Sequence, residues 1–307
     1  MTRPRRALLS AVARSLVLCA ALGALLPCAS AAPSAPAHAR PLIVFMTDFG
    51  VIDDAVAICK GVMKTIAPDA DIIDITHQVK PYSISEGARL LVRTSQYYPA
   101  GTVFVTVIDP GVGTSRKSIV LKTRRGQYFV LPDNGLITQV ADRDGVAGIR
   151  EVTNPDWQLH DASSTFHGRD VYSPVGAHVA RGDDWTQVGP ALTRFTRLEL
   201  ARATIDRAGI NGLVVALDGP FGNLVTNISR DQFGQLGFRL GDRVRVSIGS
   251  TELSVPFHRT FGEVPPGAAL LYIDSRGLVS LAVNQGNFAE KYRILPPTSL
   301  VIFRASR

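Results

Sequence analysis

The first part of the chain alternates short apolar runs with longer amphipathic segments. Three runs are apolar and rich in β-branched residues, which predicts buried strands: 41–46, 71–76 and 102–108. Two segments with apolar residues at helical spacing lie between them and predict helices: 53–67 and 85–98. Asp53 or Asp54 can cap the first helix, and Ser85 is the candidate cap of the second. Strands that alternate with helices indicate βαβ units and a mostly parallel sheet.

After the third strand the pattern predicts a hairpin and two more helices. Residues 118–122 and 128–131 are apolar and flank a turn at Arg125-Gly126. Helices are expected over 134–141 and 169–180. These elements extend the α/β region to about residue 200.

Beyond residue 200 the chain changes character. Seven short apolar runs follow one another with frequent turns: 212–218, 223–228, 242–248, 251–256, 268–273, 278–283 and 299–303. Helical periodicity is nearly absent there, which is typical of a small all-β barrel or sandwich. The sequence therefore predicts an α/β N-terminal domain with a mostly parallel sheet over 40–200, and a smaller all-β, barrel-like C-terminal domain over 201–307.

Residues 1–39 have the pattern of a signal peptide. Four Arg residues accompany a short apolar stretch, and small residues follow it at 29–31 and 37–39. We therefore expect an exported protein, periplasmic or secreted, that has no membrane attachment after cleavage. The alternative is an uncleaved anchor, for which the apolar run is short.

Composition narrows the classes of function. Segment 1–39 holds four Arg and no acidic residue, so without it the formal net charge falls from +7 to +3. No stripe of Lys and Arg with interleaved aromatic residues is present, which argues against nucleic acid as a partner. Of the three cysteines only Cys59 lies beyond that segment, so the remaining chain cannot form an intrachain disulfide.

Carboxylates stand at the ends of two predicted parallel strands. Asp48 follows the first strand, and Asp109 ends the third within VIDPGVGTSR, where Arg116 lies seven residues further on. Ligands of open α/β sheets bind outside the carboxyl ends of the strands, so both carboxylates are candidates for one crevice. The alternative is ordinary turn formation, since Asp, Pro and Gly are common turn residues.

The segment TFHGRD adds a histidine just before a predicted helix. His167 can pass protons near neutral pH, and Phe166 and Gly168 flank it. A glycine permits close backbone approach, and the free N–H groups of a helix start can face an electron-rich atom. A structural or surface histidine is the alternative.

Polar residues also end strands in the second half. DGPFGNLVTN contains Asp218 and Asn223, and a carboxylate with amides can recognise an amine and the edge of a heterocycle. DSRGLVSLAVNQGN contains Ser275 and Arg276, and an arginine can pair bidentately with a carboxylate. Turn formation is again the alternative.

Several common site motifs are absent from the sequence. No GxGxxG follows the first strand, and no GxxxxGK[ST], GxSxG, HExxH or paired CxxC is present. The spacing of the carboxylates and the histidine matches no metal motif. The sequence therefore predicts neither a cofactor nor a metal.

In combination the motifs resemble one family. TDFG, EGAR, VIDPGVGTSR, PDNG, TFHGRD, DGPFGNLVTN and SRGLVSLAVNQGN occur in this order over about residues 41–303. The chain thereby resembles the adenosine-forming S-adenosyl-L-methionine (SAM) hydrolases, which are related to the SAM-dependent fluorinating and chlorinating enzymes. The resemblance implies an α/β N-terminal domain, a β-barrel-like C-terminal domain and SAM as the substrate. It also implies a homotrimer with sites between subunits.

The resemblance implies roles for individual residues as well. Asp109, Arg116 and His167 would hold a water molecule. The implied substrate-binding residues are Asp48 at the ribose hydroxyls, Tyr82 and Phe166 beside the substrate, Asp53 and Asp218 at the methionine amino group, Asn223 at adenine, Ser275 and Arg276 at the methionine carboxylate, and Asn284 and Gln285 in the adenine pocket.

The expected reaction is hydrolysis without a metal. A sulfonium is already a good leaving group, so the reaction needs a water molecule oriented in line with C5′. A neighbouring guanidinium favours an ionised but weakly basic Asp109, so His167 is the expected proton acceptor.

The alternatives to hydrolysis differ in what happens to the substrate. In the halogenating relatives a Tyr and a Ser stand at the positions of Asp109 and Gly168, so these residues favour the hydrolase over a SAM-dependent halogenase. An exported nucleoside- or SAM-binding protein without turnover remains the second alternative, because SAM is made in the cytoplasm. A purely structural domain is the third.

Overall fold

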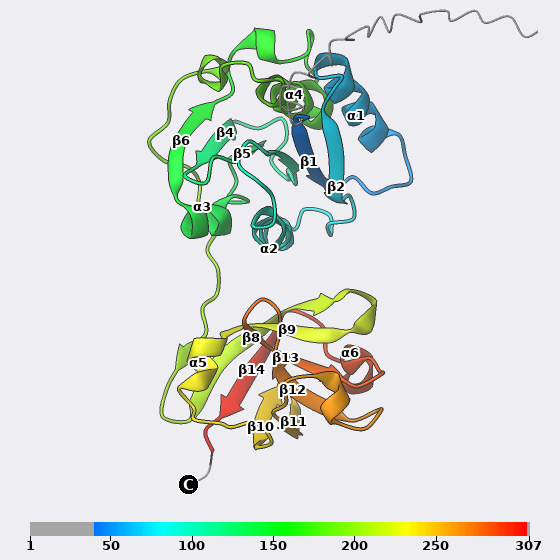
Figure 1. Ribbon diagram of the computed structural model, residues 1–307, viewed down its shortest axis with the longest axis vertical. Helices are drawn as coiled ribbons and strands as arrows, with labels where there is room; N and C mark the ends of the chain where they lie inside the picture. The colour runs from blue at the N-terminus through cyan, green and yellow to red at the C-terminus, as the bar shows by residue number, and fades with distance from the viewer. Residues whose placement is uncertain (1–39, 306–307) are drawn as a thin grey trace, which may run out of the picture. The chain divides into compact units, whose positions relative to one another are not determined.

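The computed structural model describes residues 40–305 of the chain, so the predicted leader lies outside the described residues. A six-stranded sheet with helices on both faces forms the first part, and an eight-stranded sheet forms the second (Figure 1). The predicted fold class, an α/β part followed by a barrel-like β part, is confirmed. Within residues 40–305, no helix has both the length and the apolar character that a membrane crossing requires.

The first sheet is mixed and mostly parallel. Its strands are β1 (Leu42–Thr47), β2 (Asp71–Thr76), β3 (Val103–Val107), β4 (Ser118–Thr123), β5 (Tyr128–Pro132) and β6 (Val146–Glu151). Their order is β2-β1-β3-β5-β4-β6, and β4 runs antiparallel to both of its neighbours. The chain leaves β1 for β2 on one side and returns to β3 on the other, so the crossover direction reverses at β1. Such a switch point creates a crevice at the carboxyl ends of the strands.

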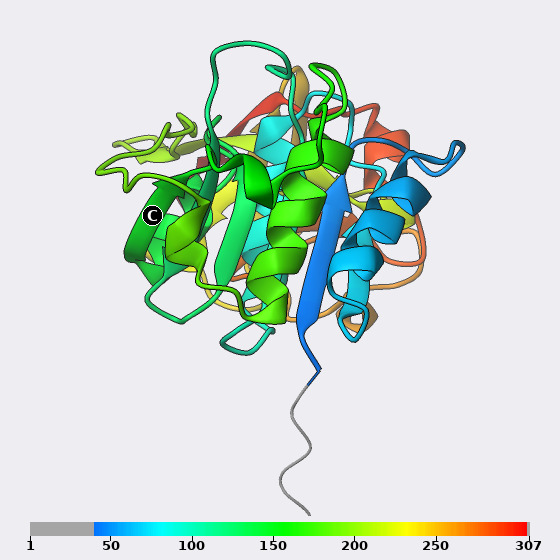
Figure 2. The same ribbon diagram turned by 90° about the horizontal axis from the view of Figure 1, so that it is seen from above.

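Helices cover both faces of this sheet (Figures 1 and 2). They are α1 (Ala55–Ile66), α2 (Ile84–Ser95), α3 (Thr138–Asp144) and α4 (Ser173–Arg181). Ile43 and Phe45 of β1 pack with α1 and α4, whereas Val44 and Met46 pack with α2 and α3. Both sides of the strand are therefore buried, which explains why β1 is continuously apolar rather than alternating.

The second sheet is antiparallel and nearly closed. Its strands are β7 (Thr204–Ile205), β8 (Gly209–Asp218), β9 (Asn223–Ser229), β10 (Arg243–Ile248), β11 (Thr251–Pro256), β12 (Ala269–Ile273), β13 (Leu278–Val283) and β14 (Thr298–Phe303). The order is β11-β10-β14-β8-β9-β13-β12, with β7 added against β8. An isolated bridge between Phe257 and Leu271 joins the β11 side to β12, which gives the part its barrel-like form.

The structure differs from the predicted elements in several places. The helix expected over 134–141 is α3 and runs over Thr138–Asp144, and the two-residue strand β7 was not predicted. β6 was not predicted, because only Ile149 of its six residues is buried and the strand lies at the sheet edge. The N-cap of α2 is Ser83 rather than Ser85. Two helices interrupt the β part, α5 (Arg230–Gly234) and α6 (Phe288–Tyr292), and with five residues each they are too short to produce a helical period in the sequence.

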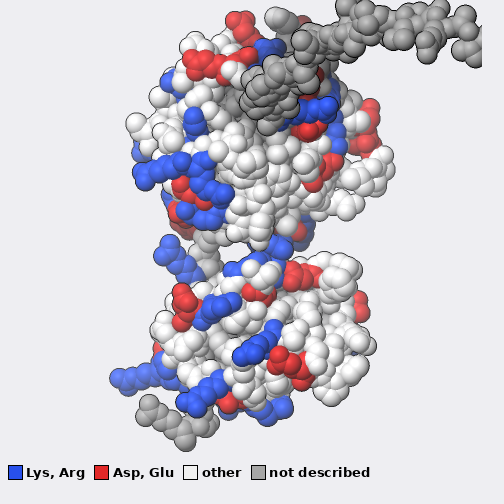
Figure 3. Space-filling model, viewed as in Figure 1, with Lys and Arg blue, Asp and Glu red and all other residues white. Residues whose placement is uncertain are grey.

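The described surface carries charges of both signs. On the face drawn in Figure 3, Lys and Arg are interspersed with Asp and Glu. Such a surface differs from the single-sign stripe that follows a nucleic-acid backbone.

Gly176 lets α4 approach β3 closely. A Cβ atom at this position would lie 2.2 Å from Cγ2 of Val105. We expect Gly176→Ala to lower the free energy of unfolding by about 1–3 kcal/mol, because an overpacked core must shift its backbone. Urea unfolding followed by circular dichroism measures the change.

Gly61 in α1 provides the matched control. No heavy atom lies within 4 Å of a Cβ at this position, so Gly61→Ala should raise the free energy of unfolding by about 0.5–1 kcal/mol through helix propensity. If both substitutions changed stability equally, close packing at Gly176 would not be the cause.

Candidate active site

A cavity of about 340 Å³ opens at the carboxyl ends of β1 and β3. Its volume lies in the range of ligand pockets, about 300–1,000 Å³. Five of the candidate residues from the sequence line it: Asp48, Tyr82, Asp109, Phe166 and His167. The crevice expected from the strand ends is therefore present, and both strand-end carboxylates face it.

Asp109 and Arg116 form an ion pair at the cavity edge. Nε of Arg116 donates to Oδ1 of Asp109 at 2.8 Å, and Nη2 donates to Oδ2. Only 5% of the Asp109 side chain and 11% of the Arg116 side chain are exposed. The turn after β3 returns the chain to make this pair, with the N–H of Val112 bonded to the carbonyl of Asp109 at 3.2 Å and Gly113 at a φ of +77°.

His167 joins this pair through one ring nitrogen. Nη2 of Arg116 lies 2.9 Å from Nδ1 of His167. Arginine can only donate, so Nδ1 must accept and a neutral His167 carries its proton on Nε2. Burial, and then the positive charge of Arg116, lower the pKa of His167 below its ordinary value, with Asp109 acting in the opposite direction. The imidazole is therefore held neutral at physiological pH.

Asp48 is fixed on the other side of the cavity. Its Oδ2 accepts the backbone N–H of Tyr82 at 2.9 Å. Tyr82 adopts a φ of +69°, and the residue is 74% exposed. The carboxylate is thus oriented by backbone, and the aromatic ring remains accessible to a ligand.

The C-terminal candidates form a separate cluster around Arg276. Nη1 and Nη2 of Arg276 donate to the two carboxylate oxygens of Asp218 at 2.8 and 2.9 Å. Nε donates to Asp274 at 2.6 Å. Burial alone would raise the pKa of Asp274, but bonds from Arg276, the Leu278 backbone and a serine hydroxyl bring it below its usual range. Asn223 faces Asp218 across the β8–β9 pair.

The remaining candidates lie outside both groups of contacts. Asp53 is exposed and accepts the backbone N–H of Ala55 at 3.2 Å, at the start of α1. Asn284 donates to the carbonyl of Val264 at 2.7 Å. Ser275 and Gln285 are exposed. None of the C-terminal candidates is among the residues that line the cavity at β1 and β3.

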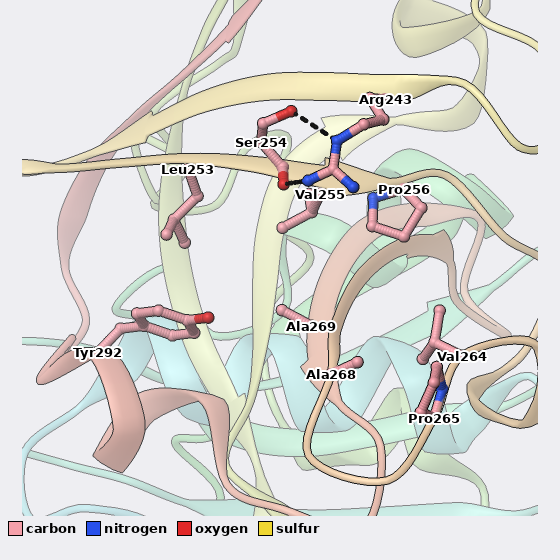
Figure 4. Close-up of a pocket in the computed structure, with 10 residues that line it drawn as sticks. All are labelled: Arg243, Leu253, Ser254, Val255, Pro256, Val264, Pro265, Ala268, Ala269 and Tyr292. Carbon is pink, nitrogen blue, oxygen red and sulfur yellow. Dashed lines mark hydrogen bonds between the residues drawn. The ribbon is translucent and has the colours of Figure 1, made fainter.

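A second hollow of about 360 Å³ lies beside β11 and the loop before β12 (Figure 4). Its lining is mainly apolar, and Arg243 is the charged residue in it. That guanidinium is bonded to the hydroxyl of Ser254 at 3.1 Å and to the Ser254 carbonyl. The hollow thus lacks the acid–base groups found at the first cavity.

Three residues that contact the candidate groups were not predicted from the sequence. Asp274 directly follows β12, as Asp48 follows β1, so a carboxylate after an apolar strand was present as a signal in DSRGLV. Ser118 and Tyr172 contact the Asp109–Arg116 pair from the protein interior. Neither carries a sequence signal, because one begins a strand and the other occupies an apolar helical position.

The fold and the cavity define a protein with an α/β part and a β part, whose polar cavity lies at the switch point of a mostly parallel sheet. Residues 43–189 match the family model of the SAM hydroxide adenosyltransferase N-terminal domain, and residues 212–300 match that of its C-terminal domain. The chain belongs to the SAM hydroxide adenosyltransferase family.

Individual relatives fall into two groups by name. The chain is 40% identical over 263 residues to an (R)-S-adenosyl-L-methionine hydrolase from Salinispora arenicola, covering 85% of this chain and 97% of that protein. It is 32% identical over 297 residues to a fluorinase from Actinopolyspora mzabensis, covering 87% and 99%. A solved structure of an uncharacterized conserved protein from Thermotoga maritima is similar at a TM-score of 0.80 and 40% identity, covering 85% of this chain and 99% of that one.

Proposed function

We propose that this protein hydrolyses SAM to adenosine and L-methionine. The observation that carries the proposal is the Asp109–Arg116–His167 group at the cavity edge, in a chain 40% identical to an (R)-S-adenosyl-L-methionine hydrolase. A carboxylate and a neutral imidazole next to a cavity are suited to orienting one water molecule.

The proposed reaction is a displacement at C5′. The water oxygen forms a bond to C5′ while the C5′–S bond breaks. The electron pair of the C5′–S bond goes to sulfur and gives the thioether of methionine. Conversion of a sulfonium cation into neutral products releases one proton overall. Because the leaving group needs no activation, the residues have to position the water and exclude other water molecules rather than supply a metal.

The hydrogen bonds favour different roles for Asp109 and His167 in the reaction. Asp109 accepts a hydrogen bond from the attacking water and passes the released proton toward solvent. His167 was expected from the sequence to accept that proton. Its Nδ1 already accepts from Arg116 and its Nε2 carries the ring proton, which favours a donor role toward the water or the ribose.

The first test follows product formation by the chain from residue 40. It is incubated with SAM and EDTA, and adenosine and methionine are followed by chromatography. Equal amounts of both products support metal-free hydrolysis. Intact SAM with bound adenosine would support the binding protein without turnover, and loss of activity with EDTA would contradict metal independence.

The fluorinases among the relatives make a halogenase the second candidate. The same assay with added chloride or fluoride tests for a 5′-halo nucleoside. Gly168 bears on this alternative, because a Cβ there would lie 2.7 Å from Cζ of Phe49. A serine at this position, as expected in the halogenating enzymes, would require the Phe49 ring to move.

The proposal includes a homotrimer with shared sites. Its support is that apolar residues are exposed in the loop that follows the cavity residues Asp48 and Phe49, Val51 at 61% and Ile52 fully. The substrate-binding candidates of the β part do not line this cavity, so a second chain would complete the site. Light scattering after size-exclusion chromatography tests the assembly, and a monomer at full activity would contradict it.

Export is also part of the proposal. It rests on the basic and apolar pattern of residues 1–39, which lie outside the described residues. Cell fractionation with N-terminal sequencing of the recovered protein tests it. An intact N-terminus in the cytoplasmic fraction would contradict export.

The protonation state of His167 can be measured directly. We expect ¹⁵N NMR of histidine-labelled protein to give an unprotonated Nδ1 and a protonated Nε2 at pH 7. Because the pKa of His167 is lowered, this neutral form should persist as the pH falls below 6.5, where an unperturbed histidine is mostly charged. His167→Gln assigns the signal. An imidazolium at pH 7, or a proton on Nδ1, would contradict the assigned hydrogen bond.

A further inference from the structure

We infer that Tyr172 is a positioning residue, whose hydroxyl, together with that of Ser118, holds Asp109 and Arg116 in the arrangement that orients the water. The inference rests on the proposed function. It adds two residues that do not line the cavity and that act through Asp109.

A closed ring of hydrogen bonds joins the four side chains. Nη1 of Arg116 donates to Oγ of Ser118 at 2.9 Å. Ser118 Oγ donates to the Tyr172 hydroxyl at 3.1 Å, and that hydroxyl donates to Oδ2 of Asp109 at 3.4 Å. The direct pair between Arg116 and Asp109 closes the ring.

The direction of every bond in this ring is fixed by its ends. A guanidinium can only donate and an ionised carboxylate can only accept. The Ser118 oxygen accepts from Arg116, so its own proton is free for Tyr172, and the phenol proton is then directed at Asp109. Neither hydroxyl can reverse the direction of its hydrogen bond without breaking a bond to a charged group. Both hydroxyl groups are therefore held in one orientation.

Burial keeps the phenol in its donor form. Tyr172 is fully buried, and its side chain is among the largest completely enclosed ones in residues 40–305. Burial, and then the charge of Asp109, raise the pKa of the Tyr172 hydroxyl far above its ordinary value. The hydroxyl therefore stays protonated at any pH at which the fold persists.

The same short segment places His167 and Tyr172. A π-helical turn, Gly168–Tyr172, begins directly after His167 and leads into α4. His167 faces the cavity from one end of this turn, and Tyr172 reaches Asp109 from the other. Single π turns inside helices are frequently found at functional sites, since the extra residue redirects side chains.

The ring leaves Asp109 with limited freedom to bind water. An ionised carboxylate offers about four acceptor positions. Nε and Nη2 of Arg116 and the Tyr172 hydroxyl take three of them. About one remains, and the cavity lies beside it, so the ring defines where on Asp109 a water can bind.

The test compares Tyr172→Phe with wild type in steady-state turnover of SAM. We expect kcat to fall about tenfold, the size of a hydrogen bond to a charged group, with KM unchanged because Tyr172 does not line the cavity. Ser118→Ala should change kcat in the same direction, and Ser118→Thr, which keeps the hydroxyl on a strand, should restore it.

Tyr128→Phe is the matched control. Tyr128 lies on β5 of the same sheet and packs its ring against Trp185 at 5.8 Å, and its hydroxyl makes no hydrogen bond within residues 40–305. Its kcat should equal that of wild type. If wild type is active and Tyr172→Phe has the same kcat, the inference is overturned while the proposed function stands. A change in the melting temperature of Tyr172→Phe would not alter that conclusion. An inactive wild type would overturn the proposed function and this inference with it.

Discussion

Replacing Asp109 by asparagine is expected to lower kcat for SAM hydrolysis by about 10²-fold or more. The substitution keeps the shape of the side chain but removes its charge. One of the two oxygens becomes an N–H donor, which would face the Arg116 guanidinium or the Tyr172 hydroxyl, both of which donate to Asp109 in the native protein. Initial rates of adenosine formation at saturating SAM measure the loss.

Asp142→Asn is the control for this experiment. Asp142 also pairs with an arginine, Arg197, but both side chains are about half exposed and neither lines the cavity. Exposed pairs contribute little, so this variant should keep the wild-type rate. If Asp109→Asn also hydrolysed SAM at the wild-type rate, Asp109 would have no part in orienting the water.

The strand-end candidates could be predicted because parallel sheets impose a simple geometry. Asp48 and Asp109 follow strands that lie next to each other in register, Thr47 opposite Val107, so their positions in the sequence already bring them to one edge. The approach of His167 depends instead on the turn before α4. That contact was implied by the resemblance of the motifs to a known family, and not by spacing.

Tyr172 and Ser118 could not be predicted from the sequence. A tyrosine in an apolar helical segment indicates core packing, and it is indeed buried. Its hydroxyl contacts Asp109 from the end of a π turn that precedes α4, and the sequence pattern gave no sign of that turn. Such local irregularities follow from tertiary packing, which leaves no periodic signal in the chain.

Arg276 illustrates how a residue type can suggest a partner without fixing it. The sequence suggested that Arg276 binds a carboxylate of the ligand, and in the structure it binds two carboxylates of the protein, Asp218 and Asp274. The second carboxylate, two residues before the arginine, is placed by the turn after β12. Recognition of the methionine carboxylate of the substrate would therefore rely on the hydrogen-bond donors that this network leaves free.

Replacing Arg116 by methionine is expected to cost about 3–5 kcal/mol of unfolding free energy, in addition to a loss of activity. The Asp109 side chain is 5% exposed and would lose the cation that accounts for most of its hydrogen bonds. Ser118 and His167 would each lose a donor as well. Urea unfolding of the variant and of wild type measures the difference.

The double variant Asp109→Asn, Arg116→Met tests whether the two residues act together or independently. Neutralising both side chains removes the unpaired buried charge, so the double variant should be more stable than Arg116→Met alone. Its activity should be no lower than that of the less active single variant, because residues that act as a unit lose their function together. Additive losses in both stability and kcat would mean that Asp109 and Arg116 act independently, and the water would then have to be held by other groups.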